Sequence, residues 1–302
     1  MSARAGCGEG RAAPVVKRKL LPDELTDLWQ SVEQHELSVE AFTREQERLL
    51  AQYRQTWEDA LLLQGHRDLR ESLLTELGLY TQCSDLAEIE RLCTQAVATL
   101  KDEWQATVRS DERRSIERFY DESRTTMYEL MWWHSLRDDT SPLAYVTALH
   151  FAQQRGCRRY LDFGAGVGSG GILFAHHGFD VTLADISSTL LQFTSWRLRR
   201  RGLPAAHVDL KTSPLTPHAV DFVTAMDVFE HLVDPVSTVE HLSGALKPGG
   251  LLFARLAAEP DVDRPQHIVQ DFEPTFERLR SLGFTEVWRD AWLWGHRVFQ
   301  KA

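Results

Sequence analysis

The stretch that decides the fold is Tyr160-Leu-Asp-Phe-Gly-Ala-Gly-Val-Gly-Ser-Gly-Gly171. It begins as a short apolar strand, passes through a glycine-rich turn and ends where a helix starts. Glycines at 164, 166 and 168 permit backbone angles that a Cβ atom forbids, and they leave room for a ligand against bare peptide. The helix after the turn would offer that ligand unpaired N–H groups and the positive end of its dipole. The stretch therefore predicts a ligand site.

Two classes of ligand fit this turn. Gly166, Gly168 and Gly171 match the G-x-G-x-x-G pattern of dinucleotide-binding folds. Asp162, two residues before Gly164, offers a carboxylate that suits a cation better than a phosphate. With this acid, the segment reads D-x-G-x-G-x-G, which resembles the first motif of class I S-adenosylmethionine-dependent methyltransferases. A tight turn without a ligand is the third alternative.

Composition limits the class of protein. The 302 residues are 43% hydrophobic and 26% charged, which is typical of a soluble globular protein. A net charge of −10 argues against a nucleic-acid surface, because phosphate contacts need clustered cations. No apolar run approaches the roughly 20 residues of a membrane helix, and the first 19 residues lack the apolar core of a secretory signal. Four scattered cysteines predict neither disulfides nor a zinc knuckle. We expect a cytoplasmic protein.

The chain divides into three parts. Residues 1–20 are expected to be disordered, and residues 21–140 form a helical extension or lid. From residue 158 strands and helices alternate, which predicts a parallel sheet covered on both faces. The fold class is therefore α/β, a doubly wound, seven-stranded Rossmann-like sheet with an α-helical N-terminal extension, and residues 141–302 form the ligand-binding domain. Strands are expected at 159–163, 179–184, 206–210, 219–226, 251–256, 285–289 and 296–300.

Helical spacing of apolar residues predicts the remaining elements. One helix is expected to run from residue 22 through 57, one from 69 to 77 with Gly78 as its stop, and one from Asp85, whose capping-box partner is Glu88. Further helices are expected at 115–136, 141–154, 168–177, 188–201, 236–246 and 273–282. The first helices could also join two copies of the chain as a homodimer.

Two of these helices carry unusual side chains. The helix over 115–136 is rich in aromatic residues, which either pack against the sheet domain or form a lid over an acceptor, with a wall made of Tyr128, Trp132, Trp133 and His134. The helix over 188–201 ends in arginines. Because cations suit a helix C-terminus, we interpret these as a solvated helix end rather than a nucleic-acid patch: Arg197, Arg199, Arg200 and Arg201.

Acidic residues follow several predicted strands, at the edge where doubly wound sheets bind ligands. Asp185 lies 21 residues after Gly164, where an acid commonly accepts two ribose hydroxyls. That role would serve either a nicotinamide cofactor or S-adenosylmethionine, and capping of the helix near Ser187 is the structural alternative. The acids on this edge are Asp162, Asp185, Asp209 and Asp227.

Later segments favour the methyltransferase resemblance. Asp209-Leu210 resembles the adenine-contacting segment of that family, Asp221–Pro235 its fourth-strand segment, and Leu246–Gly250 its turn before the fifth strand. The region from residue 158 onward resembles small-molecule class I enzymes, namely ubiquinone-biosynthesis O-methyltransferases and natural-product methyltransferases. The resemblance implies S-adenosylmethionine as cofactor, bound by Asp162, Gly164, Ala165, Gly166, Asp185, Ile186, Asp209, Leu210 and Asp227.

The catalytic residues are expected after the fourth and fifth strands. Asp227, Glu230 and His231 share one side if a helical turn begins at residue 228. In ubiquinone-type enzymes an acid with a Glu-His pair is linked to a divalent metal; this chain has Asp at the first place, so the metal is left open. His231 could be a general base, a metal ligand or a loop anchor. His267 should hang over the same pocket from a mobile loop, and the catalytic set is His231, Glu230 and His267.

The resemblance implies methyl transfer from S-adenosylmethionine to a small-molecule acceptor, with oxygen as the first choice and nitrogen or carbon as alternatives. The sulfonium is already electrophilic, so the protein need only align a nucleophile and remove its proton. A nicotinamide-linked oxidoreductase is the rival enzyme class. A non-catalytic scaffold with the same fold is the third hypothesis. The acceptor and the oligomeric state stay open at this point.

Overall fold

The computed structural model describes residues 21–109, 112–257, 262–269 and 271–302. Residues 1–20, expected to be disordered, lie outside this part. A seven-stranded sheet forms the centre, in the order β3-β2-β1-β4-β5-β7-β6. Strand β7 runs antiparallel to both neighbours and the other pairs are parallel. The strands are β1 Arg159–Phe163, β2 Asp180–Asp185, β3 Ala206–Asp209, β4 Val220–Ala225, β5 Leu246–Ala254, β6 Phe284–Arg289 and β7 Arg297–Lys301.

Helices cover both faces of the sheet, as the alternating pattern predicts. Side chains along a strand point to opposite faces, so Tyr160 of β1 joins one apolar core and its neighbour Leu161 joins the other. The first core includes α7 (Ala144–Gln154), α8 (Ser169–His176) and α9 (Ser188–Arg200). The second includes α10 (Pro235–Ala245) and α11 (Glu273–Ser281). The predicted doubly wound α/β fold is confirmed.

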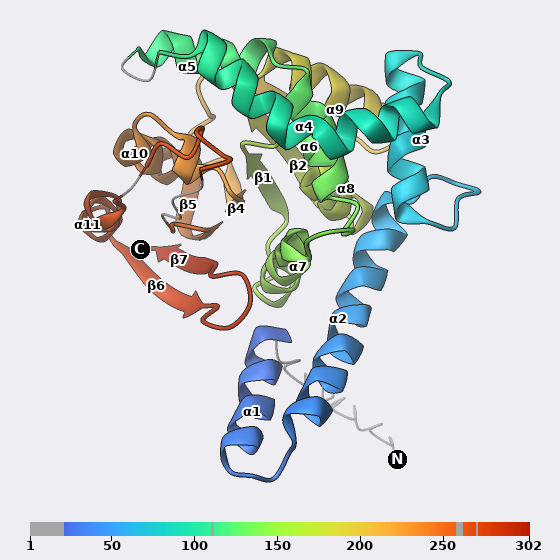
Figure 1. Cartoon of the computed structure of the whole chain (residues 1–302). Coiled ribbons are helices and arrows are strands. Elements are labelled where there is room, and N and C mark those ends of the chain that lie inside the picture. The colour runs from blue at the N-terminus through green and yellow to red at the C-terminus, as the bar shows by residue number, and fades with distance from the viewer. Residues whose placement is uncertain (1–20, 110–111, 258–261, 270) are drawn as a thin grey trace, which may run out of the picture.

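In the described part of the chain, six α-helices precede the sheet domain. They are α1 Leu21–Glu33, α2 Val39–Leu61, α3 Leu69–Thr81, α4 Leu86–Thr107, α5 Arg113–Glu122 and α6 Thr125–Trp133. Helices α4 to α6 lie across the end of the sheet toward which β1 points, and α1 with the start of α2 extends away from the body (Figure 1). Trp57 of α2 and Leu73 of α3 belong to the same core as Tyr160. The helical extension therefore shares a continuous core with one face of the sheet.

Two expected helices are each two helices. The stretch 22–57 breaks at residues 34–38, where His35 has a φ of 61° and the Ser38 side chain accepts from the N–H of Ala41 to start α2. The stretch 115–136 breaks at Ser123, whose extended backbone separates α5 from α6. Apolar spacing alone continues through both breaks, because polar residues at the turns leave the helical period unchanged.

The other helix boundaries follow their local signals, with one exception. Asp85 caps α4, as predicted, by accepting from the N–H groups of Ala87 and Glu88. The Glu88 carboxylate accepts from Arg91 rather than completing the expected capping box. Gly78 does not stop α3, which continues to Thr81. A Cβ at Gly78 would lie 2.7 Å from the carbonyl oxygen of Cys83. This glycine therefore permits a close approach of the returning chain rather than ending the helix.

The interpretation of the α9 arginines as a solvated end is wrong for Arg197 and Arg201. The Arg197 side chain is fully buried, and it contacts the Glu76 carboxylate at 3.0 Å. Arg201 pairs with the same carboxylate. Burial opposes ionisation of Glu76, but the two guanidinium groups outweigh it and hold its pKa below the usual value. This ion cluster joins α3 to α9.

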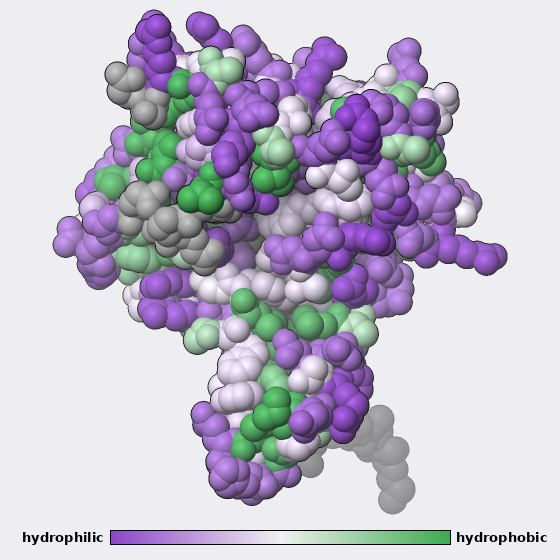
Figure 2. All heavy atoms as spheres, in the orientation of Figure 1, coloured by the Kyte–Doolittle hydropathy of each residue, from purple (hydrophilic) through white to green (hydrophobic). Residues whose placement is uncertain are grey.

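The N-terminal arm, formed by α1 and the start of α2, exposes apolar side chains. Figure 2 shows apolar side chains on the visible side of the protruding arm. Val39, the first residue of α2, is 54% exposed. Within the described ranges, every helix is too short or too polar to cross a bilayer.

Candidate active site

The glycine-rich turn has the backbone that its sequence predicts. Gly164, Gly166 and Gly168 have φ values of 69°, 53° and 73°. A Cβ at Gly164 would lie 2.5 Å from the Val228 side chain, and one at Gly168 would lie 2.3 Å from Thr194. Glycine is therefore required at these positions by both conformation and space.

Asp185 ties this turn to the next helix. One carboxylate oxygen accepts from the N–H of Gly166 at 2.9 Å, and the other accepts from the N–H of Ser187 at 2.8 Å. Ser187 itself caps α9 by accepting from Leu190, so the capping role expected as the alternative for Asp185 falls to Ser187. Burial raises the pKa of Asp185. The acid lies at the mouth of the turn, within the wall of the cavity described next.

A cavity of about 1620 Å³ opens above the carboxyl ends of β1, β2, β4 and β5. Helices α5 and α6, α10, the segment after β5 and the β6–β7 loop also contribute to its wall. Most of the side chains predicted for the site face this one cavity. They are Gly164, Ala165, Gly166, Asp185, Ile186, Leu210, Asp227, Glu230, His231 and His267.

Asp162 and Asp209 lie outside the cavity wall. Asp162 is fully buried within the sheet domain and accepts from the hydroxyl groups of Thr224 at 2.9 Å and Tyr145 at 3.3 Å. Burial raises the pKa of Asp162 to about 7. Asp209 accepts from the backbone N–H of Lys211 at 2.9 Å, so its carboxylate closes its own turn. Neither orientation can be read from the position of an acid after a strand.

Arg255, directly after β5, contacts two acids that follow β4. Its guanidinium lies 3.1 Å from Asp227 and 3.9 Å from Glu230. Burial raises the pKa of Asp227 and the charge of Arg255 opposes this. Arg255 was not predicted as a site residue because the fifth strand was expected to run to residue 256, whereas β5 ends at Ala254 and leaves Arg255 at the edge where a doubly wound sheet binds ligands.

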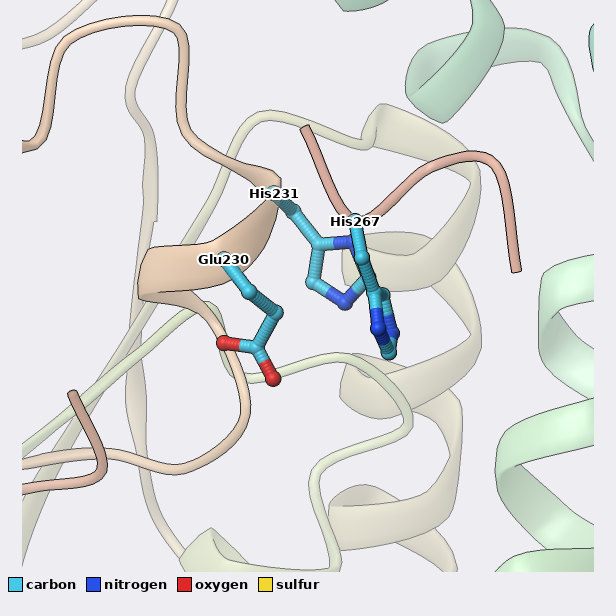
Figure 3. A group of neighbouring side chains, drawn as sticks. All are labelled: Glu230, His231 and His267. Atoms are coloured by element: carbon cyan, nitrogen blue, oxygen red, sulfur yellow. The ribbon is translucent and has the colours of Figure 1, made fainter. Parts of the chain in front are cut away.

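Glu230, His231 and His267 converge as predicted (Figure 3). The two imidazole rings meet edge to face, with centroids 4.9 Å apart. Burial, together with the neighbouring His267, lowers the pKa of His231 to about 3. The ligand atoms of the three residues lie within 4.8 Å of one another. Two imidazoles and a carboxylate form a donor set that suits a transition metal or zinc, so the group fits a divalent cation.

The helical wall differs in part from the expected lid. Trp133 and His134 line the cavity, whereas Tyr128 and Trp132 do not. The indole of Trp132 instead donates to Asp138 at 2.7 Å. The side chains that replace them are Tyr120, Glu129 and Leu130. Helical spacing identifies the apolar stripe of such a helix, but it does not say which part of the stripe faces the core and which faces the cavity.

Tyr120 and Glu129 connect this wall to the residues after β4 and β5. The Tyr120 hydroxyl lies 3.0 Å from Nδ1 of His231. Glu129 pairs with Arg264, which counteracts the rise in the pKa of Glu129 that burial causes. Burial also raises the pKa of Tyr120, which keeps its hydroxyl protonated. Helices α5 and α6 are thus bonded directly to the segments that follow β4 and β5.

A second missed element is the β6–β7 loop, whose residues 290–296 all line the cavity. Asp290 is buried, and its carboxylate accepts from the N–H groups of Trp292, Leu293 and Trp294. The ring of Trp292 packs against Trp29 of α1. Trp292 and Trp294, which lie between two short predicted strands, were the sequence signal that could have identified this loop as part of the site. The loop supplies an aromatic wall beyond the tip of β5.

Comparison with known proteins agrees with this geometry. Residues 161–252 match a family described as "Methyltransferase domain". A ubiquinone biosynthesis O-methyltransferase of Photorhabdus laumondii is 33% identical over 134 residues, which are 40% of this chain and 54% of that relative. One of Nitrosospira multiformis is 36% identical over 99 residues, 31% of this chain and 40% of the relative. The chain spans about half the length of the curated relatives it matches.

A solved structure from Leishmania major, described as a SAM-dependent methyltransferase, is similar over 66% of this chain and 89% of that one. The TM-score is 0.50 and the sequence identity is 16%. At this identity the likeness shows the fold.

Proposed function

We propose that the chain is a class I S-adenosylmethionine-dependent methyltransferase that transfers a methyl group to the oxygen of a small-molecule acceptor. The match of residues 161–252 to a methyltransferase domain and the similarity to ubiquinone biosynthesis O-methyltransferases support this. The observation that carries the proposal is a single cavity bordered by the glycine-rich turn, by Asp185 and by the Glu230–His231–His267 group. Residues 141–302 would form the catalytic domain, and residues 21–140 would close it as a lid.

The cofactor would lie across the turn. Asp185 would accept the ribose hydroxyls while it keeps the turn in place through Gly166. Ile186 and Leu210 line the cavity beside it and offer apolar contacts to the adenine. The acids Asp185 and Asp227 would favour the sulfonium cation over the neutral product, S-adenosylhomocysteine.

The acceptor would lie beside His231. When bound, S-adenosylmethionine would supply an electrophilic methyl group that the acceptor oxygen takes with loss of neutral S-adenosylhomocysteine, and His231 would accept the acceptor proton. Because the pKa of His231 is about 3, the imidazole is neutral at neutral pH but weakly basic. A weak base needs an acidic partner. A phenol, with a pKa near about 10, therefore fits better than an aliphatic alcohol.

A divalent cation held by Glu230, His231 and His267 is the second candidate for this step. The donor atoms are close enough to share one ion. When bound, such an ion would lower the pKa of an oxygen ligand and so assist its deprotonation. Acid–base catalysis and metal assistance make opposite predictions for a chelator, and this difference decides between them.

The proposal is tested with a panel of phenols and radiolabelled S-adenosylmethionine, with and without EDTA. We expect the radiolabelled methyl group to appear in a phenol. His231→Asn and His267→Asn should each lower the rate of methyl transfer by about 10²-fold or more if these residues act in proton transfer. His176→Asn, an exposed position outside the cavity wall, is the matched control. Loss of activity with EDTA would favour the metal. Stabilisation by NADH but not by S-adenosylhomocysteine would favour the oxidoreductase instead.

The N-terminal arm would join two copies of the chain. Its apolar residues include Val39 at 54% exposure, and Leu28 and Val32 are only partly buried. Sedimentation velocity tests this: we expect a dimer in the wild type and a monomer for Val39→Glu. Identical monomers in both samples would refute the pairing and leave the methyltransferase proposal intact.

A further inference from the structure

Nδ1 of His231 has two neighbours of different chemistry. The carbonyl oxygen of Gln266 lies 3.1 Å away and the hydroxyl oxygen of Tyr120 lies 3.0 Å away. A carbonyl oxygen can accept but never donate, so a hydrogen bond to it requires a proton on Nδ1. Once that proton is present, the Tyr120 oxygen must share it as a second acceptor. A neutral imidazole then has no proton on Nε2.

We propose that Tyr120 and the Gln266 carbonyl together hold His231 as the Nδ1–H tautomer, which leaves Nε2 as the ring atom able to take a proton. Nε2 points toward the space between the Glu230 carboxylate and the His267 ring (Figure 3). Tyr120 is therefore a positioning residue: it acts on the acceptor through His231. The tautomer itself follows from the contacts, and its use in methyl transfer rests on the proposed function.

The two acceptors come from segments that pack on each other. Tyr120 of α5 contacts Trp104 and lies in the same apolar cluster as Ile268, two residues after Gln266. The N–H groups of Ile268 and Val269 donate to the carbonyl of Glu230 at 2.9 and 3.1 Å. The segment that carries Gln266 is thus fixed both to α5 and to the chain beside His231. The tautomer of His231 is therefore fixed by the packing of α5 against the segment that carries Gln266.

Nuclear magnetic resonance tests the proposal without an acceptor. The full chain is labelled with ¹⁵N-histidine, kept in EDTA at neutral pH, and its His231 signals are assigned with His231→Gln. Long-range proton–nitrogen correlations distinguish a protonated nitrogen from an unprotonated one. We expect a protonated Nδ1 and an unprotonated Nε2 in the wild type. A dominant Nε2–H form would overturn the proposal, whatever the variants do.

Variants isolate the part played by Tyr120. Tyr120→Phe removes one of the two acceptors and should shift the tautomer ratio of His231 by about fivefold toward Nε2–H, the equivalent of about one hydrogen bond. Tyr128→Phe on α6, half-buried and outside the cavity wall, is the matched control and should leave the His231 signals unchanged. Unchanged signals in a folded Tyr120→Phe protein would overturn the role of Tyr120.

Cofactor binding keeps the two proposals apart. We expect the wild type and Tyr120→Phe to bind S-adenosylhomocysteine with affinities that agree within about threefold, because Tyr120 acts on the acceptor side. Absence of binding in both proteins would contradict the proposed function, while the tautomer measurement would still decide this inference. A selective loss of binding in the variant would contradict the assignment of Tyr120 to the acceptor side.

Discussion

The cavity has two walls that are built in different ways: one proposed to bind the cofactor (the cofactor wall) and one proposed to face the acceptor (the acceptor wall). On the cofactor wall, Asp185 bonds to Gly166, 19 residues earlier, and both belong to one strand–turn–helix–strand unit. On the acceptor wall, Tyr120 reaches His231 across 111 residues and Arg264 reaches Glu129 across 135. The cofactor wall is specified by a local sequence motif. The acceptor wall forms only when α5 and α6 pack against the segments that follow β4 and β5. We therefore expect substitutions to affect cofactor binding and acceptor binding separately.

The largest effect is expected where the helical extension is joined to the sheet domain. Glu76 of α3 faces two arginines of α9 in the interior, so Glu76→Gln leaves two buried cations without their counter-ion. We expect the free energy of unfolding to fall by about 3–5 kcal/mol, measured in urea. Glu240→Gln, in an exposed pair with Arg278, is the control, with a loss under about 1 kcal/mol. Equal losses of unfolding free energy in the two variants would contradict a stabilising role for the buried Glu76 ion cluster.

Asp162, buried beneath the cofactor wall, should make the stability of the protein depend on pH. Its folded pKa, about 7, is raised above the unfolded value. The folded state therefore binds this proton more tightly, so the contribution of Asp162 to stability is greatest below about pH 4 and declines toward about pH 7. The steepest slope is about 1.4 kcal/mol per pH unit. Asp162→Asn should remove this slope. Parallel melting-temperature curves for variant and wild type would refute the assignment.

Asp185 tests the cofactor wall itself. Asp185→Ala removes the acceptor for two backbone N–H groups and the proposed ribose contact. We expect the dissociation constant for S-adenosylhomocysteine to rise about 10- to 100-fold. Asp209→Ala is the comparison, since that carboxylate bonds within its own turn, and its effect should stay below about threefold. The reverse ranking would show that the cofactor lies nearer β3.

The smallest effect is expected on the acceptor wall, at the contact between α6 and the segment after β5. Arg264→Ala leaves Glu129 buried without this partner. Hydrogen exchange over residues 262–269 should accelerate about 5- to 10-fold, which corresponds to roughly one hydrogen bond. Asp263→Asn, in a more exposed pair with Lys101, should change exchange by less than about twofold. Cofactor affinity should stay constant in both variants.

The same contrast explains what the sequence could predict. The strands and the turn around Gly164 follow from apolar runs bounded by glycines, and the structure confirms them. The direction of Asp162 and the burial of Arg197 depend on partners from other elements, Tyr145 and Glu76. No local pattern encodes such partners.

The acceptor wall was predicted only in part for the same reason. His231 and His267 stand after strands and could be placed at the sheet edge. Tyr120 and Arg255 are recognisable only from tertiary contacts. Periodicity places Tyr120 on an apolar stripe, and the break at Ser123 then turns α6 relative to α5.

Titration calorimetry with S-adenosylhomocysteine on folded, ligand-free protein tests the central claim most directly. The account predicts heat that fits one site per chain in the wild type and a strongly weakened response in Asp185→Ala. A wild-type titration with no heat, on protein whose melting curve shows that it is folded, would contradict the placement of the cofactor across the glycine-rich turn.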